Sequence, residues 1–173
     1  MKDYSLKDIY ILYGTGKNIK RYSIKSICNS LGESKSKAVV VLHAISGCDD
    51  VSSFRGKGKK SFWKAWKSFD SMTPIFQDIY DHPFTPIAID SEPFNKLQRF
   101  IVLAYSVTSS IMTLNEARKE FFCQKNHSFE NLPLTKNSFW HHLQRAIRRV
   151  GIWSLCDRSP TVPDPKDFSW KKG

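Results

Sequence analysis

The sequence predicts a mainly helical protein, an α/β fragment in which a short N-terminal β-hairpin precedes a helical body and an extended C-terminal tail. Apolar residues recur at helical spacing through most of the 173 residues, and a run near the N-terminus is β-branched and aromatic. Prolines interrupt the last twenty or so residues, where little periodicity remains. We therefore expect one domain over residues 1–151 and an extended or disordered tail over residues 152–173.

The N-terminal part begins with the predicted hairpin. Its strands are residues 9–13, Ile-Tyr-Ile-Leu-Tyr, and residues 20–24, and they are separated by a turn-forming segment rich in glycine. A helix capped by Ser23 should follow and end at Gly32. Residues 34–46 are almost all apolar, which indicates a buried helix, although their β-branched side chains leave a strand possible.

Further helices are predicted beyond a loop from Gly47 to Gly58. They cover residues 59–69, 74–80, 94–107, 113–124 and 135–150, and the last is expected to close at Gly151. The helix over residues 59–69 is basic and amphipathic, and the spacing of its aromatic residues indicates a stripe that packs into the core rather than stacking on bases. Residues 113–116 form a capping-box pattern.

The balance of charge is the first indication of function. Lys and Arg number 27 and Asp and Glu 16, so the chain carries a formal charge of +11, which favours a polyanionic partner. The N-terminus has no apolar signal segment and no run approaches the ~18 apolar residues of a membrane span, so we expect an intracellular protein without membrane contact. The four cysteines are far apart, as expected of reduced thiols.

Residues 47–66 hold the candidate site. Asp49 and Asp50 follow a buried element and are candidate ligands of Mg²⁺ or Mn²⁺, although aspartates at this position also serve as turn caps. A Gly-x-Gly turn then opens the basic helix, where amide groups and ammonium groups can approach phosphate oxygens. The candidate nucleic-acid-binding residues are Gly56, Lys57, Gly58, Lys59, Lys60 and Lys64; the alternative is a solvated turn leading into a surface helix.

These residues resemble the flap-endonuclease type of PIN-like nucleases, in which a Gly-x-Asp motif precedes a helix–hairpin–helix with two glycines. The resemblance implies that Asp49 helps to hold a divalent metal ion and that residues 56–60 grip one strand of duplex DNA. The whole chain also resembles uncharacterised, multi-copy animal proteins with a mobile-element character. The motifs that carry this second likeness are residues 13–18, 43–49, 56–60, 115–122 and 163–165.

The chain departs from the nuclease pattern in its acidic residues. Only Asp3, Asp8 and Glu33 precede Gly47, so the likeness is to the C-terminal portion of such a domain, with most of the metal-binding carboxylates missing. The leading hypothesis is DNA binding by a truncated domain that is inactive alone, in an intracellular and possibly nuclear location. One alternative is a metal-dependent endonuclease completed by upstream carboxylates of another chain, and another is a non-catalytic module that binds protein or RNA.

Histidines and a second basic stretch carry less weight. His43 is expected to be a hydrogen-bonded core residue, or else to reach a site near Asp49, and His141 and His142 cannot both face one metal from one helix. Lys136, Arg145, Arg148 and Arg149 lie in a region without acidic residues and form a basic face that is either solvated or tracks a phosphate backbone.

Overall fold

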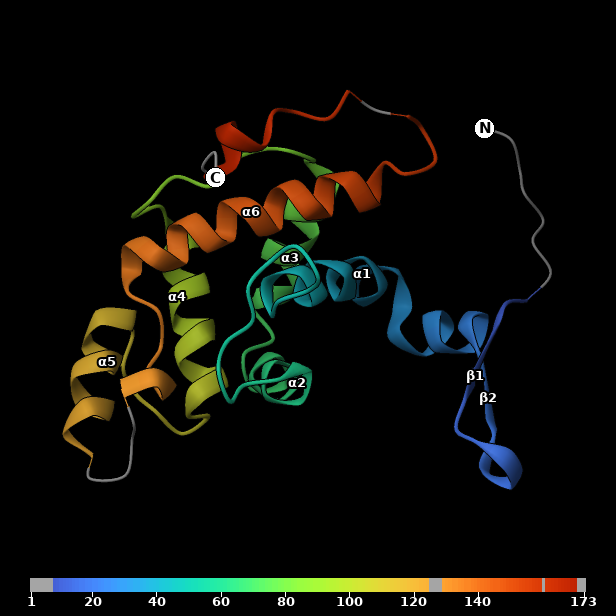
Figure 1. Ribbon diagram of the computed structural model, residues 1–173, viewed down its shortest axis with the longest axis horizontal. Helices are drawn as coiled ribbons and strands as arrows, with labels where there is room; N and C mark the ends of the chain where they lie inside the picture. The colour runs from blue at the N-terminus through green and yellow to red at the C-terminus, as the bar shows by residue number, and fades with distance from the viewer. Residues whose placement is uncertain (1–7, 125–128, 160, 171–173) are drawn as a thin grey trace.

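The structure is a computed structural model that describes residues 8–124, 129–159 and 161–170 and has the mainly helical architecture that the sequence predicts (Figure 1). Its helices and strands, in chain order, are β1 (Tyr10–Tyr13), β2 (Lys20–Ser23), α1 (Ile24–Ile45), α2 (Lys59–Ser68), α3 (Met72–Asp81), α4 (Glu92–Tyr105), α5 (Leu114–Cys123) and α6 (Lys136–Ser154). Short 3-10 turns lie at Gly16–Asn18, Phe129–Asn131 and Pro165–Phe168.

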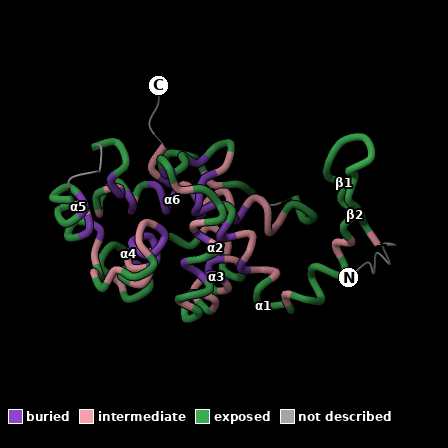
Figure 2. The backbone as a smooth tube through the Cα atoms, turned by 90° about the horizontal axis from the view of Figure 1, so that it is seen from below, coloured by how far each residue is buried: buried purple, intermediate pink, exposed green. Residues whose placement is uncertain are grey.

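The predicted hairpin is present and projects away from the helical body (Figures 1 and 2). β1 and β2 are antiparallel, with Tyr10 opposite Ser23 and Tyr13 opposite Lys20. Every residue of β1 is exposed, whereas the buried residues gather among the helices. The hairpin therefore contributes little to the core of the described fold.

α1 consists of the two helices that the sequence predicts, joined across a kink. Ser23 caps the first, since its side chain accepts the N–H of Ser26. Gly32 leaves the helical region with φ +74°, a conformation that glycine adopts without steric cost. Beyond the kink the apolar stretch is helical rather than extended, and Ala38, Val41 and Ile45 are buried. The strand alternative for residues 34–46 is therefore wrong.

The core forms where α1 packs on α3 and α6, and where α2 packs on α4. Phe62 and Trp66 of the aromatic stripe of α2 are buried in this core as predicted, whereas Trp63 and Phe69 of the stripe are half-buried. Phe62 lies 5.9 Å from the ring of Phe100, and Phe76 of α3 meets the same ring at 5.4 Å. Burial of such large apolar rings is the main source of stability for a body of this size.

Capping side chains set where several helices begin. Thr113 accepts the N–H of Glu116 as the predicted capping box requires, and its hydroxyl donates to the Glu116 side chain at 2.8 Å. α4 begins two residues earlier than predicted, at Glu92, because the side chain of Ser91 accepts the N–H of Phe94.

Gly151 does not end the last helix as predicted, since α6 continues to Ser154. The glycine is buried, and a Cβ atom at this position would lie 2.5 Å from Cε1 of Phe84. Its function is to let the Phe84 ring approach the backbone of α6, and the helix propensity of its neighbours carries the helix through it.

The tail runs back along α6 in its described part rather than being detached from the body (Figure 1). Phe168 is 3% exposed, and its ring lies 6.4 Å from that of Phe84. The tail predicted from residue 152 is extended only in part, because α6 continues to Ser154 and Pro165–Phe168 form a 3-10 turn. None of the helices in the described ranges is both long and apolar enough to cross a bilayer.

Candidate nucleic-acid interface

The segment after α1 begins with a tight turn that presents the two aspartates. Cys48 and Val51 exchange backbone hydrogen bonds of 2.9 and 3.2 Å, so Asp49 and Asp50 occupy the tip of a two-residue turn and are exposed. Gly47 has φ +97°, and a Cβ atom there would lie 2.6 Å from Cα of Ser53. Only glycine therefore allows the chain to turn back this closely at the end of α1.

The two aspartates differ in their surroundings. The carboxylate of Asp50 forms an ion pair with the guanidinium of Arg149 on α6, and this pair attaches the turn to the body. The negative charge of Asp49 raises the pKa of His43, although burial and Lys59 lower that pKa by more. Within the described residues no group of three or more His, Cys, Asp or Glu side chains is placed to hold a metal ion. The structure thus brings Asp49 and Asp50 side by side, with no third such ligand from the described part of the chain.

A second turn follows, and it contains the first glycine of the predicted clamp. The N–H of Lys57 donates to the carbonyl of Phe54 at 3.0 Å, and Gly56 between them has φ +70°. Phe54 is buried and lies 5.1 Å from the ring of Phe62 on α2. The glycine segment therefore joins two helices, as predicted, but those helices pack mainly on other elements, α1 on α3 and α6 and α2 on α4.

His142 on α6 forms two hydrogen bonds that hold the loop after α1 in place. Its Nε2 donates to the carbonyl of Ile45 at 2.8 Å, and its Nδ1 accepts from the hydroxyl of Ser52 at 3.2 Å. Burial lowers the pKa of His142 to about 4, so the imidazole is neutral at pH 7 and can both donate and accept. The sequence showed no sign of this role, because Ile45 and Ser52 lie far from His142 along the chain.

Six basic residues lie between Val51 and Lys67. The structure divides them into two groups. Arg55, Lys57 and Lys59 have partners within the protein. Arg55 pairs with Glu130 at 2.6 Å. Lys57 donates to the carbonyl of Tyr105 at the end of α4, at 3.1 Å. Lys57 thus caps the C-terminus of α4, and Arg55 pairs with the exposed carboxylate of Glu130.

Lys59 is the most strongly engaged member of this stretch. Its ammonium donates to the carbonyls of His43 and Gly47 and to the hydroxyl of Ser46, at 2.7 Å for His43 and 2.8 Å for Ser46. An ammonium has three donors, so all of them are used at the C-terminus of α1. Burial lowers the pKa of Lys59. The Lys59 ammonium therefore caps the end of α1, and its contact with phosphate stays a prediction.

The second group consists of Lys60, Lys64 and Lys67, which follow one face of α2. All three are exposed, and none has an ion-pair partner among the described residues. They line a groove of about 560 Å³ between α1 and α2, which we call the lysine groove. Its full lining is Val39, Leu42, His43, Lys59, Lys60, Trp63, Lys64 and Lys67. No acidic side chain takes part in this described lining.

The lysine groove has an apolar floor and a cationic rim. Val39 and Trp63 are half-buried, and Leu42 is buried, so their side chains present carbon atoms between the lysines. His43, expected either in the core or near Asp49, is exposed on the rim of the groove, with its ring 5.4 Å from that of Trp153. Burial and the charge of Lys59 lower the pKa of His43, while Asp49 raises it. Lys67 was not among the predicted site residues, although its spacing from Lys60 and Lys64 on a helix could have indicated it.

The second basic stretch is used to hold the chain together. Arg145 donates to the carbonyl of Ser169 at 3.3 Å, and Arg148 donates to that of Pro163 at 3.1 Å. Arg149 pairs with Asp50, and Lys136 pairs with Asp90. Arg145 and Arg148 hold the tail, Arg149 holds the aspartate turn, and Lys136 holds the segment before α4, so the idea that they form a face for a phosphate backbone is not supported.

Comparisons with known proteins give no match for this chain. In these comparisons the sequence matches no protein-family model and no curated protein, and the fold matches no solved structure. The likeness to flap-endonuclease-type nucleases therefore stays a prediction from the residues of the Gly-x-Asp and Gly-x-Gly segments. Further statements about function depend on the geometry of the lysine groove.

Proposed function

We propose that the protein binds nucleic acid, in particular DNA, through the lysine groove. The observation that carries the proposal is the row formed by Lys60, Lys64 and Lys67, which are exposed on one helix face without acidic partners in the described structure. Lysines placed in this way attract phosphates and release the counterions that surround them. The overall charge of +11 adds a long-range attraction of the same sign.

The floor of the groove supports a preference for unpaired strands. A phosphate backbone that follows the lysines would bring its sugars or bases over the half-buried Trp63 and its apolar neighbours. Bases of a single strand can reach such a surface, and contact of a base with an aromatic ring contributes about 1–3 kcal/mol. A duplex keeps its bases stacked and offers only its backbone. Single-stranded DNA should therefore bind more tightly than a duplex.

The test measures the affinity for short single-stranded and duplex DNA as a function of salt, by fluorescence anisotropy. We expect Lys60→Gln/Lys64→Gln to weaken binding and to flatten the plot of log affinity against log salt by about one unit per lysine. The matched control is Lys119→Gln/Lys166→Gln, which removes the same charge from exposed positions outside the groove. Equal losses in the two double variants would show that only net charge matters and would refute the groove as the binding site.

The proposal covers binding without cleavage by this chain alone. Asp49 and Asp50 remain the candidate Mg²⁺ or Mn²⁺ ligands, but Asp50 is already paired with Arg149. Cleavage by two metal ions needs more carboxylates than the aspartate turn offers, so we expect the endonuclease alternative to require ligands from another chain. Nicking of plasmid DNA with Mg²⁺ or Mn²⁺ that is lost in Asp49→Asn would overturn this part of the proposal. A role on DNA also implies an intracellular, nuclear location.

A further inference from the structure

β1 has an edge that no strand of the described chain covers. β1 and β2 form a sheet of two strands, and the N–H of Ile24 donates to the carbonyl of Ile9 at 2.8 Å. In an antiparallel pair the backbone groups of alternate residues face the partner strand. Ile9, Ile11 and Tyr13 therefore face β2, and the N–H and C=O groups of Tyr10 and Leu12 point away from it.

The side chains of β1 are apolar on both faces of the sheet. They alternate between the faces, so Tyr10 and Leu12 lie on one and Ile11 and Tyr13 on the other. Leu12 is 68% exposed and Tyr13 72%. A strand that is apolar on both faces is typical of the middle of a covered sheet, and an isolated hairpin is at best marginally stable in water. β1 thus has the composition of a central strand but the environment of an edge strand.

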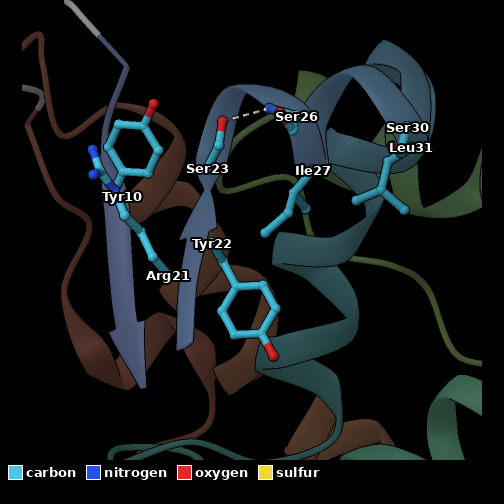
Figure 3. A pocket seen from close by; sticks show the side chains of 8 residues that line it. All are labelled: Tyr10, Arg21, Tyr22, Ser23, Ser26, Ile27, Ser30 and Leu31. Atoms are coloured by element: carbon cyan, nitrogen blue, oxygen red, sulfur yellow. Dashed lines mark hydrogen bonds between the residues drawn. The ribbon is translucent and has the colours of Figure 1, made fainter. Parts of the chain in front are cut away.

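The two edges of the hairpin differ in charge, and this difference makes the β1 edge the better site for adding another strand. β2 contains Lys20 and Arg21, and charged residues on an edge strand oppose the addition of another strand. β1 contains no charged residue. Figure 3 shows Arg21 beside the Tyr10 ring, at 3.6 Å from its centre, while Tyr22 points from β2 toward α1.

We propose that a second copy of this chain adds its β1 to this edge, which gives a four-stranded antiparallel sheet with a twofold axis at Ile11. In this register Ile11 meets its own copy and Tyr10 lies opposite Leu12 of the second copy, so the apolar run is complementary to itself. The basic β2 strands become the outer strands. They are three strand spacings apart, about 14 Å, which exceeds the screening length of about 8 Å in physiological salt.

The exposed apolar side chains beside this edge supply much of the area that a dimer needs. Taking about 200 Å² for a whole side chain, the exposed fractions correspond to roughly 570 Å² per copy. The side chains counted are Ile9, Tyr10, Ile11, Leu12 and Tyr13. A stable interface buries about 800 Å² per partner. The groove lined by Tyr22, Ile27 and Leu31 among others lies between β2 and α1, on the other side of the hairpin from this edge (Figure 3).

The first test uses analytical ultracentrifugation of the full chain, whose mass is 20.0 kDa. The wild type should sediment at twice this mass at micromolar concentration. Leu12→Pro removes an N–H that points from the free edge and no hydrogen bond between β1 and β2, so it should weaken the dimer about tenfold or more. The matched control, Arg21→Pro, removes an outward N–H from the β2 edge and should leave the dimer intact.

The second test probes the register and does not depend on a proline variant. At the twofold axis, Ile11 and its copy form a non-hydrogen-bonded pair with Cα atoms about 4.5 Å apart, close enough for a disulfide. Oxidised Ile11→Cys should form a dimer linked through residue 11, as located by peptide mass spectrometry. Tyr13→Cys should not, because the two copies of residue 13 lie about 14 Å apart.

Three results would overturn the proposal. They are a wild type that stays at 20.0 kDa throughout the micromolar range, a Leu12→Pro variant that dimerises like the wild type, and cross-linking at Ile11→Cys that is no faster than at Tyr13→Cys. Circular dichroism on each variant shows whether its helices remain folded, so a loss of dimer can be separated from a loss of structure.

Discussion

Protonation of His142 should destabilise the fold in a defined range of pH. The ring lies between α6, the end of α1 and the loop after it, where Nδ1 accepts from Ser52 and Nε2 donates to Ile45. Burial lowers its pKa to about 4 from 6.5. Between these values the unfolded chain binds a proton that the folded protein excludes, so stability rises with pH up to about 6.5 and is constant above it.

The size of the effect follows from the two pKa values. From pH 7 to pH 5 the free energy of unfolding should fall by about 2 kcal/mol through this residue, and by about 3 kcal/mol at pH 4. The assay is urea unfolding of wild type and of His142→Gln at several pH values. Other titrating groups are common to both proteins, so the difference between their stabilities isolates the histidine. The variant is expected to be less stable at pH 7 and to lose this disadvantage as the pH falls.

The result that would refute this reasoning is a pair of parallel curves. If the difference in stability between wild type and His142→Gln stays constant from pH 7 to pH 4, the imidazole is not held neutral by the fold. His142 would then not be buried with these two hydrogen bonds in the protein in solution.

Two further predictions concern the loop and its lysines. Gly47→Ala should lower the free energy of unfolding by about 3 kcal/mol, since an alanine would be strained at φ +97° and would collide with the backbone. Gly58→Ala, with negative φ and no atom within 4 Å of the added Cβ, should cost about 1 kcal/mol or less in the same urea experiment. Lys59→Met should cost about 1–2 kcal/mol of stability because the end of α1 loses its cap, whereas Lys60→Met should leave stability unchanged and weaken DNA binding. A reversed pattern, with Lys60→Met the destabilising change, would contradict the division of the lysines described above.

Much of the fold could be predicted because its signals are local. Apolar residues three and four positions apart define a helix, and side chains such as Ser23 and Thr113 bind amides three residues later. These signals placed the hairpin and the helices. They failed at Gly151, where the reason for a glycine is the Phe84 ring from another part of the chain.

The candidate site could be predicted only in part. The sequence indicated a basic, glycine-containing entry to a helix, and that entry is the start of α2. It could not indicate that Lys57 would be tied to Tyr105 and Lys59 to the end of α1. Nor could it indicate that Lys67 would share a groove with Lys60. Long flexible side chains reach partners far away in the chain, and the spacing of lysines along the sequence does not indicate which partners they reach.

The sequence by itself determined the helical class, the apolar composition of β1, the surplus of positive charge and the position of the glycine segment. These properties depend on neighbours within a few residues or on simple sums over the chain. Only the tertiary structure decided which cations remain available to a ligand and which edge of the hairpin is unprotected. That decision depends on which helix ends, loops and strands meet in space, because a donor that is bonded inside the protein is no longer available outside it.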